Sequence, residues 1–381
     1  MLVWPALLIL VFQLLIAVEV LRGSRRLIAL EQITPVPSQR LPSLSIIAAA
    51  RNEERNIAAA LTSLLLLDYP QLELVLVNDR STDRTQDIVA AIAAQDERLT
   101  ILQIDELPPG WLGKNHALWR GSQLASGELL LFTDADIIMA PQTLRHAVSL
   151  LLTHQLDHLT LSPAVRMPGM LLNLLGATFG LFFGLHTRPW RVTDRHSACH
   201  IGIGAFNLVR ADAYHQVGGH RTICLRPDDD LKLGKIIKKA GFRQQFAYGE
   251  RFIQVQWYAS LREMVVGLEK NLFAGTDYRI GLTCAGLVAS LLLFVWPYLA
   301  LLSGSGATRL LSLLTVLTIT LVVVDSSRRH GFSPWYAAGL PVAVLLLCGV
   351  AARTMILNLV QGGITWRGTF YPLRELRKNR V

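Results

Sequence analysis

Long apolar runs lie at both ends of the chain, and short apolar strands alternating with amphipathic helices lie between them. Residues 2–21 are about 20 nearly uncharged positions, enough to cross a bilayer as a helix. Three later runs have the same character, at residues 281–302, 310–324 and 335–360. We therefore predict one N-terminal and three C-terminal membrane spans, the last of which carries Arg353 as an unusual intramembrane charge.

The first run could instead be a secretory signal peptide. No basic region precedes it, however, and no small-residue cleavage site follows it. Arg22, Arg25 and Arg26 come directly after the run, so we predict an uncleaved anchor whose following residues are cytoplasmic. Four spans would then leave the basic residues after Arg367 outside, although their charge favours the inside, and a re-entrant or interfacial segment would resolve this conflict.

The central region predicts an α/β fold. A proline-containing linker leads into strands expected at residues 44–50, 72–77, 99–103 and 128–132. Helices are expected between them, at residues 52–66, 82–94 and 115–125, with Asp79 and Ser81 as caps of the second helix. Such alternation specifies a mostly parallel, Rossmann-like sheet, whose ligands bind beyond the carboxyl ends of the strands.

A further apolar stretch, residues 170–185, is interrupted by one asparagine and three glycines. If it crossed the membrane, Asp134 and Asp230 would lie on opposite sides and could not share a site. We therefore expect an interfacial or a buried helix here, and the sequence leaves these two open.

Composition and charge narrow the class of protein. Of the 381 residues, 51% are hydrophobic, and the formal net charge is +9. The basic residues cluster beside the apolar runs, which favours anionic lipid headgroups over nucleic acid, so no nucleic-acid partner is expected. The four cysteines have neither zinc-site nor disulfide-framework spacing, which indicates a reducing compartment.

Two acidic motifs carry candidate chemistry. Asp134-Ala135-Asp136 closes the fourth expected strand, and two carboxylates so spaced can share a hard divalent cation. Asp228-Asp229-Asp230 concentrates like charge, which raises carboxylate pKa values and suits a general base. The alternative for Asp134-Ala135-Asp136 is a chance surface motif, and the alternative for Asp228-Asp229-Asp230 is a polar helix cap.

His196 and His200 lack a third ligand nearby, so we do not expect zinc there.

Several short motifs together resemble the family 2 glycosyltransferases with a GT-A fold, over about residues 44–280. The matching pieces, in chain order, are Arg51-Asn52-Glu53-Glu54, Asn78-Asp79-Arg80-Ser81, Gly113-Lys114-Asn115-His116, Asp134-Ala135-Asp136, Gly202-Ile203-Gly204 and Asp229-Asp230-Leu231. Residues 362–371 also resemble membrane members that glycosylate lipids, including the ceramide-glucosyltransferase-like and carotenoid or hopanoid branches.

This resemblance assigns expected roles. It implies that Asp230 is the general base with Asp229 as its neighbour, and that Asp136, with Asp134, binds Mn²⁺ or Mg²⁺. It implies a nucleotide-sugar site formed by Glu53, Asp79, Lys114 and Asp134. Gly204 and Trp257 are expected at the acceptor site, although an aromatic residue at a membrane boundary explains Trp257 equally well.

One departure from the family bears on the reaction. Processive polysaccharide synthases carry Gln-X-X-Arg-Trp after the base, whereas this chain has Gln254-Val255-Gln256-Trp257, without the arginine. The missing arginine favours transfer of a single sugar over chain extension. Together with the resemblance, which implies an inverting, metal-dependent reaction, it predicts transfer of one sugar from a UDP-sugar to a membrane lipid. The alternatives are a processive exopolysaccharide synthase and, in another class, a transporter or a non-enzymatic scaffold.

The expected organisation follows from these assignments. It consists of a membrane anchor (1–22), a linker (23–43), a GT-A catalytic domain (44–280), a transmembrane region (281–363) and a basic tail (364–381). We expect a multi-pass protein of the cytoplasmic, inner membrane whose catalytic domain faces the cytoplasm.

Overall fold

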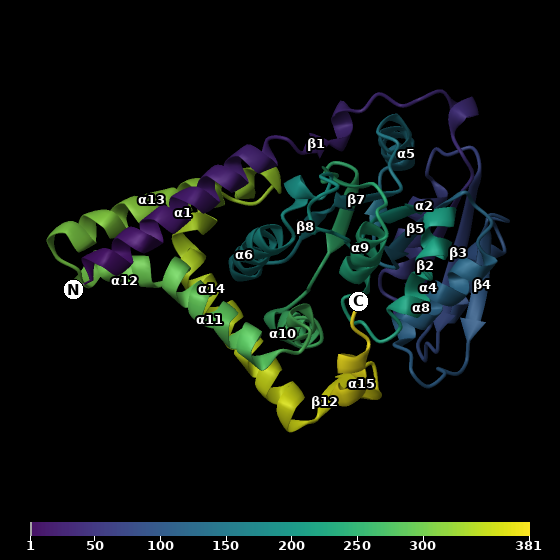
Figure 1. The fold of residues 1–381 in the computed structure, drawn as a ribbon. Coiled ribbons are helices and arrows are strands. Elements are labelled where there is room, and N and C mark those ends of the chain that lie inside the picture. The colour runs from purple at the N-terminus through teal and green to yellow at the C-terminus, as the bar shows by residue number, and fades with distance from the viewer. Residues whose placement is uncertain (1) are drawn as a thin grey trace. The chain divides into compact units, whose positions relative to one another are not determined.

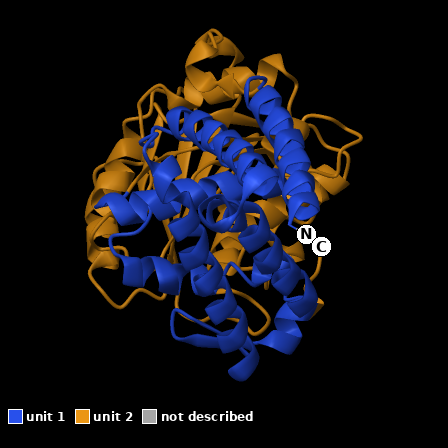
Figure 2. Cartoon of the chain, turned by 90° about the vertical axis from the view of Figure 1, so that its left-hand side faces the viewer, with its two compact units in different colours: residues 1–26, 167–187, 257–377 blue, residues 27–166, 188–256, 378–381 orange. Residues whose placement is uncertain are grey.

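The computed structural model describes residues 2–381, which form two compact units. We call Met1–Arg26, Met167–Thr187 and Trp257–Arg377 the helical unit. We call Leu27–Arg166, Arg188–Gln256 and Lys378–Val381 the sheet unit. Figure 2 colours them blue and orange. Two parts of the expected catalytic domain (44–280) therefore belong to the helical unit, namely Met167–Thr187 and residues 257–280.

An eight-stranded sheet forms the centre of the sheet unit. Its strands are, in spatial order, β1 (Ile28–Ala29), β10 (Gln244–Tyr248), β7 (His158–Ser162), β9 (Asn207–Arg210), β5 (Leu129–Asp134), β2 (Leu44–Ala50), β3 (Leu72–Asp79) and β4 (Leu99–Ile104). All neighbours are parallel except β9, which runs antiparallel to β5 and β7. The predicted α/β class with a mostly parallel sheet is confirmed (Figure 1).

The structure agrees with the predicted bounds of the first strand but not with the predicted first residues of the two helices that follow. The strand over Leu44–Ala50 has the expected bounds, while α2 spans Ile57–Leu65 and α3 spans Thr85–Ala93. The predicted caps Asp79 and Ser81 are wrong, because α3 begins only at Thr85. The amide of Thr85 instead donates to Asp83 Oδ1 at 3.0 Å.

Helices cover both faces of the sheet. The side chains of Ile46 and Ala48 on β2 belong to one apolar core, shared with α2 and α5 (Thr143–Thr153). Ile47 faces the other core, shared with α4 (Gly113–Leu124) and α9 (Asp229–Lys239). Because both faces are buried, β2 is apolar throughout and not alternating, as central parallel strands are.

The remaining elements of the sheet unit are short. They are the helices α7 (Ala211–Gln216) and α8 (Gly219–Thr222), three 3₁₀ helices (Leu30–Gln32, Ser38–Arg40 and Pro189–Arg191) and the small sheet of β6 (Ile138–Met139), β11 (Ile253–Gln256) and β8 (Ala164–Arg166).

The helical unit contains the apolar runs as helices. Five helical segments of the described residues are long and apolar enough to cross a membrane: Val3–Ser24 (α1), Met170–Arg191, Ile280–Ser303, Gly306–Arg329 (α13) and Tyr336–Val360 (α14). The second begins with α6 (Met170–Thr187). Helix α1 lies alongside α13 (Figure 1).

Two of these runs differ from their predicted form. Residues 281–302 form two helices, α11 (Ile280–Phe294) and α12 (Trp296–Ser303), because Pro297 has no N–H to continue the first helix. Helix α13 extends beyond the expected residues 310–324. Its last turn carries an ion pair between Asp325 and Arg329, whose Nε lies 2.8 Å from Asp325 Oδ2.

The helical unit contains a second ion pair, on α14. Arg353, the unusual charge of α14, forms an ion pair with Glu269 at the end of α10 (Leu261–Glu269). The segment expected to be a basic tail instead begins with a hairpin of β12 (Gly363–Trp366) and β13 (Thr369–Pro372). It continues as α15 (Leu373–Lys378).

Candidate active site

The carboxylates of the predicted site gather at the carboxyl ends of neighbouring strands. Strand β2 lies between β3 and β5, so that Ala50 pairs with Asn78 and Ala49 with Asp134. Asp79 is the last residue of β3, and Asp134 is the last of β5. The parallel sheet therefore brings residues that are far apart in the sequence to one edge, where open α/β sheets bind their ligands.

Lys114 connects the two acidic motifs. It lies in the first turn of α4, and its Nζ is 2.8 Å from Asp134 Oδ1 and 3.3 Å from Asp229 Oδ2. Burial alone would lower the pKa of this lysine, but the negative charges of Asp134, Asp229 and Asp230 outweigh burial and raise it. Lys114 therefore stays protonated and supplies a fixed positive charge between the motifs.

Asp230 occupies the first turn of α9, in contact with the glycine-containing loop before β9. Its Oδ2 accepts a hydrogen bond from the Gly204 amide at 2.8 Å, and its Oδ1 accepts one from Leu231 N at 2.7 Å. Burial and the charge of Asp229 raise the pKa of Asp230 to about 7, against the opposing effect of Lys114. A carboxyl group with this pKa can accept a proton near neutral pH.

Gly204 has no room for a side chain. A Cβ at this position would lie 2.6 Å from Asp134 Oδ2, and the Gly204 carbonyl accepts a hydrogen bond from the Asp134 amide at 3.1 Å. Since the Gly204 amide also binds Asp230, this residue holds the two acidic motifs at a short separation. A Cβ at Gly202 would similarly collide with the Asp230 carbonyl.

Asp136 lies close enough to Asp134 and Glu53 for their charges to act on its carboxyl group. Burial, followed by the charges of Asp134 and Glu53, raises the pKa of Asp136 to about 7. The described residues contain no group of three or more His, Cys, Asp or Glu side chains that could hold a metal ion. Asp134 and Asp136 supply two carboxylates, the type of oxygen ligand that a hard cation such as Mg²⁺ takes one or two of when phosphate oxygens and water fill its other positions.

The loops after β2 and β3 are bound to each other, and this positions Glu53. Asn52 accepts a hydrogen bond from Thr82 N at 2.8 Å, and its own amide donates to Ser81 Oγ at 3.0 Å. The Glu53 amide donates to Thr85 Oγ1 at 2.9 Å. Asn52 has a φ of 56°, a left-handed conformation that asparagine tolerates better than most residues.

Asp79 is buried and bound by arginine. Arg80 holds it with two hydrogen bonds, Nε to Oδ1 at 2.7 Å and Nη2 to Oδ2 at 2.8 Å, and Arg51 Nη1 lies 4.0 Å from Oδ2. A Cβ at Gly113 would collide with the same carboxylate. Asp79 therefore lies beside Gly113 in the first turn of α4, and Gly113 directly precedes Lys114 in the chain.

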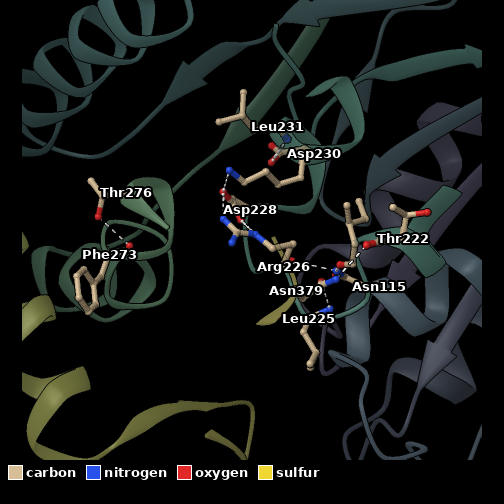
Figure 3. Close-up of polar contacts among 12 residues, drawn as sticks. Asn115, Thr222, Leu225, Arg226, Asp228, Asp230, Leu231, Phe273, Thr276 and Asn379 are labelled. Carbon is tan, nitrogen blue, oxygen red and sulfur yellow. Dashed lines mark hydrogen bonds and ion pairs between the residues drawn. The ribbon is translucent and has the colours of Figure 1, made fainter. Parts of the chain in front are cut away.

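Asp228, the first residue of the acidic run Asp228-Asp229-Asp230, is neutralised by basic side chains. Asp228 receives two hydrogen bonds from Arg226, at 2.9 and 3.0 Å, and lies 3.5 Å from Lys232 Nζ (Figure 3). Like-charge repulsion at Asp230 therefore comes mainly from Asp229. Arg226 is completely buried, and no motif in the sequence indicates a role for it.

Two predicted features lie elsewhere. Trp257 belongs to the helical unit, where its ring packs against Phe179 of α6 and against Tyr258, each at a centroid distance of 4.8 Å. His196 and His200 lie in an irregular segment and not on a helix, so their spacing does not bring them onto one helical face.

The fold has a counterpart among solved structures. A mannosyltransferase from Pyrobaculum calidifontis, in complex with GDP-Man and Mn²⁺, superposes with a TM-score of 0.55 at 19% identity. The match covers 90% of this chain and 99% of that chain. The fold is thus of the GT-A type.

The sequence model described as "Glycosyltransferase like family 2" matches residues 42–267, more than half of the chain. The chain therefore belongs to this family of sugar-transferring enzymes.

Individual relatives are more distant. A 4,4'-diaponeurosporenoate glycosyltransferase of Staphylococcus aureus is 24% identical over 352 residues, 87% of this chain and 89% of its own. A protein of the same name from Staphylococcus haemolyticus is 23% identical over 245 residues, 62% of each chain. A beta-monoglucosyldiacylglycerol synthase of Nostoc sp. is 38% identical over 112 residues, 29% of this chain and 24% of its own. The chain thus spans less than two thirds of the last two relatives.

Proposed function

We propose that this protein transfers one sugar from a UDP-sugar to a membrane lipid, by an inverting reaction that needs a divalent metal. The observation that carries the proposal is the acidic cluster around Lys114, in which Asp134 and Asp229 bind the same ammonium group. It combines a potential cation site, a fixed positive charge and, in Asp230, a base with a pKa of about 7.

The proposed donor site uses the strand-end residues. Carboxylates such as Glu53 and Asp79 accept hydrogen bonds from ribose hydroxyls and from a base N–H, and we assign them to the nucleoside. Lys114 suits the diphosphate, because its positive charge remains fixed as negative charge develops on the leaving group. Asp134 and Asp136 would hold Mn²⁺ or Mg²⁺, which neutralises that diphosphate as the sugar–oxygen bond breaks.

The proposed acceptor chemistry centres on Asp230. Its carboxylate takes the proton of a lipid hydroxyl, and the resulting oxygen attacks the anomeric carbon opposite the diphosphate. The bond from carbon to the diphosphate oxygen breaks as the new glycosidic bond forms, so the configuration inverts. Gly204 holds Asp230 in place for this role, and Trp257 is proposed to contact the acceptor. No covalent enzyme intermediate is needed.

A lipid acceptor is supported by two features. Five helical segments of the described residues are apolar and long enough for a membrane. Relatives named 4,4'-diaponeurosporenoate glycosyltransferase and beta-monoglucosyldiacylglycerol synthase match the chain. The absence of an arginine between Gln254 and Trp257 favours a single transfer over chain extension.

Radiolabelled UDP-sugars incubated with native membranes should yield a discrete glycolipid that organic solvent extracts. GDP-sugars serve as the comparison, and membranes without the protein as the blank. Label in a ladder or a high-molecular-weight polymer would refute the single transfer and favour a processive synthase. Incorporation from a GDP-sugar alone would refute the UDP assignment.

We also propose that the sheet unit faces the cytoplasm, where nucleotide-sugars are made. A Gln95→Cys variant, with Cys199, Cys224, Cys284 and Cys348 replaced by serine, provides one exposed thiol in that unit. Impermeant maleimide should label it only after lysis. Labelling in intact spheroplasts would reverse the orientation.

A further inference from the structure

We propose that Asn379 is a positioning residue that holds the loop leading to the acidic run, so that a segment beyond the apolar helices controls the geometry of the base. This inference rests on the proposed function of Asp230. Asn379 lies in Lys378–Val381, which returns to the sheet unit after the chain has left it at Gln256.

The side chain of Asn379 binds the loop at two points. Its Oδ1 accepts a hydrogen bond from Leu225 N at 2.9 Å, and its Nδ2 donates to the Thr222 carbonyl at 3.0 Å (Figure 3). Both polar groups of the amide are thus used on a stretch of four residues. Val381 adds an apolar contact with the core between the sheet and α9.

A second asparagine holds the same loop from within the site. Asn115 follows Lys114 on α4, and its Nδ2 donates to the carbonyls of Ile223 at 2.7 Å and Arg226 at 2.9 Å. The Leu112 amide adds a bond to the Cys224 carbonyl at 2.8 Å. The loop from Thr222 to Arg226 is therefore fixed between α4 and Asn379.

The loop transmits this position directly to the base. Arg226, at its end, is completely buried and binds Asp228 through both Nε and Nη2. Asp229 and Asp230 follow at once as the first turn of α9. Since reacting groups must be held within fractions of an ångström, a small shift at Leu225 would misplace Asp230 relative to the acceptor.

The same contact has a consequence for membrane topology. A segment that is part of the sheet unit lies on the same side of the membrane as the strand-end carboxylates. The chain between Gln256 and Lys378 must then cross an even number of times, although it contains three apolar runs. At least one of the three runs therefore does not cross the membrane.

The test uses the full-length protein with Asn379→Ala. Transfer should fall by about 10-fold in kcat while KM for the UDP-sugar stays unchanged, because the side chain of Asn379 binds Leu225 and Thr222 and none of the residues assigned to the donor. Hydrogen exchange in peptides covering residues 222–231 should accelerate. Lys378→Ala and Arg380→Ala are the matched controls, since both side chains are exposed, and they should match wild type.

The proposal would be overturned if Asn379→Ala kept both the wild-type hydrogen-exchange rates in residues 222–231 and the wild-type kcat. It would also be overturned if hydrogen exchange became faster throughout the sheet unit. A thiol at Arg380→Cys should label on the same side as one at Gln95→Cys, and opposite labelling would also overturn it. If the wild-type protein transfers no sugar, the proposed function fails, while exchange and labelling still decide the role of Asn379.

Discussion

Asp230→Asn should lower sugar transfer by about 100-fold or more while leaving the binding of the UDP-sugar close to wild type. Asparagine has the shape of aspartate, and its single amide oxygen can accept one of the two hydrogen bonds that Gly204 N and Leu231 N donate to Oδ2 and Oδ1 of Asp230. It cannot take a proton from the acceptor. Transfer rate and UDP-sugar affinity, measured on the same preparation, separate the loss of a base from the loss of a site.

The pH dependence gives a second measure of the same role. Burial and Asp229 raise the pKa of Asp230 to about 7, so the active, deprotonated form is lost as the pH falls through that value. kcat/KM of the wild type should therefore rise with pH up to about 7 and then level off.

Asp212→Asn is the matched control for this substitution. Asp212 also lies in the first turn of a helix, α7, and its Oδ1 accepts the amide of the next residue, Ala213, at 2.7 Å. It is exposed and remote from the strand-end carboxylates in the sequence, so its variant should keep full transfer. Near-normal transfer by Asp230→Asn would assign the base elsewhere, with Asp229 as the first candidate.

The strands were predictable because their apolar runs are local signals. Strand β2 is apolar on both faces since it packs helices on both sides, and its bounds follow from the sequence alone. The start of α2 was not predictable in this way. Asn52 binds Thr82 and Ser81, and this contact between two loops keeps residues after β2 out of the helix until Ile57.

The residues of the candidate site also fall into two groups, those that the sequence predicts and those that only the folded chain brings together. The positions of Asp79 and Asp134 follow from a general property of parallel sheets, which collects strand ends at one edge. Arg226 lies two residues before Asp228, but its complete burial and its pairing with Asp228 are properties of the folded chain that no sequence pattern indicates. Asn379 lies 154 residues from Leu225, and no periodicity or motif links positions that only the folded chain brings together.

Asp136→Ala should remove most of the transfer activity, by about 100-fold or more, since a bound metal contributes several kcal/mol to stabilising a phosphoryl leaving group. Asp136 is half-buried at a strand end, and its nearest charges include those of Asp134 and Glu53. Lys114 forms its ion pairs with Asp134 and Asp229, and it offsets the charge of Asp136 only in part. A divalent cation would compensate the remaining negative charge.

Metal removal tests this assignment directly. Excess EDTA should abolish transfer by the wild-type protein, and added Mn²⁺ or Mg²⁺ should restore it but should not rescue Asp136→Ala. Asp105→Ala is the control, because Asp105 follows the end of β4, is exposed and belongs to no ion pair among those described. Full turnover in excess EDTA would exclude the metal role, and Lys114 would then be the group expected to stabilise the leaving diphosphate.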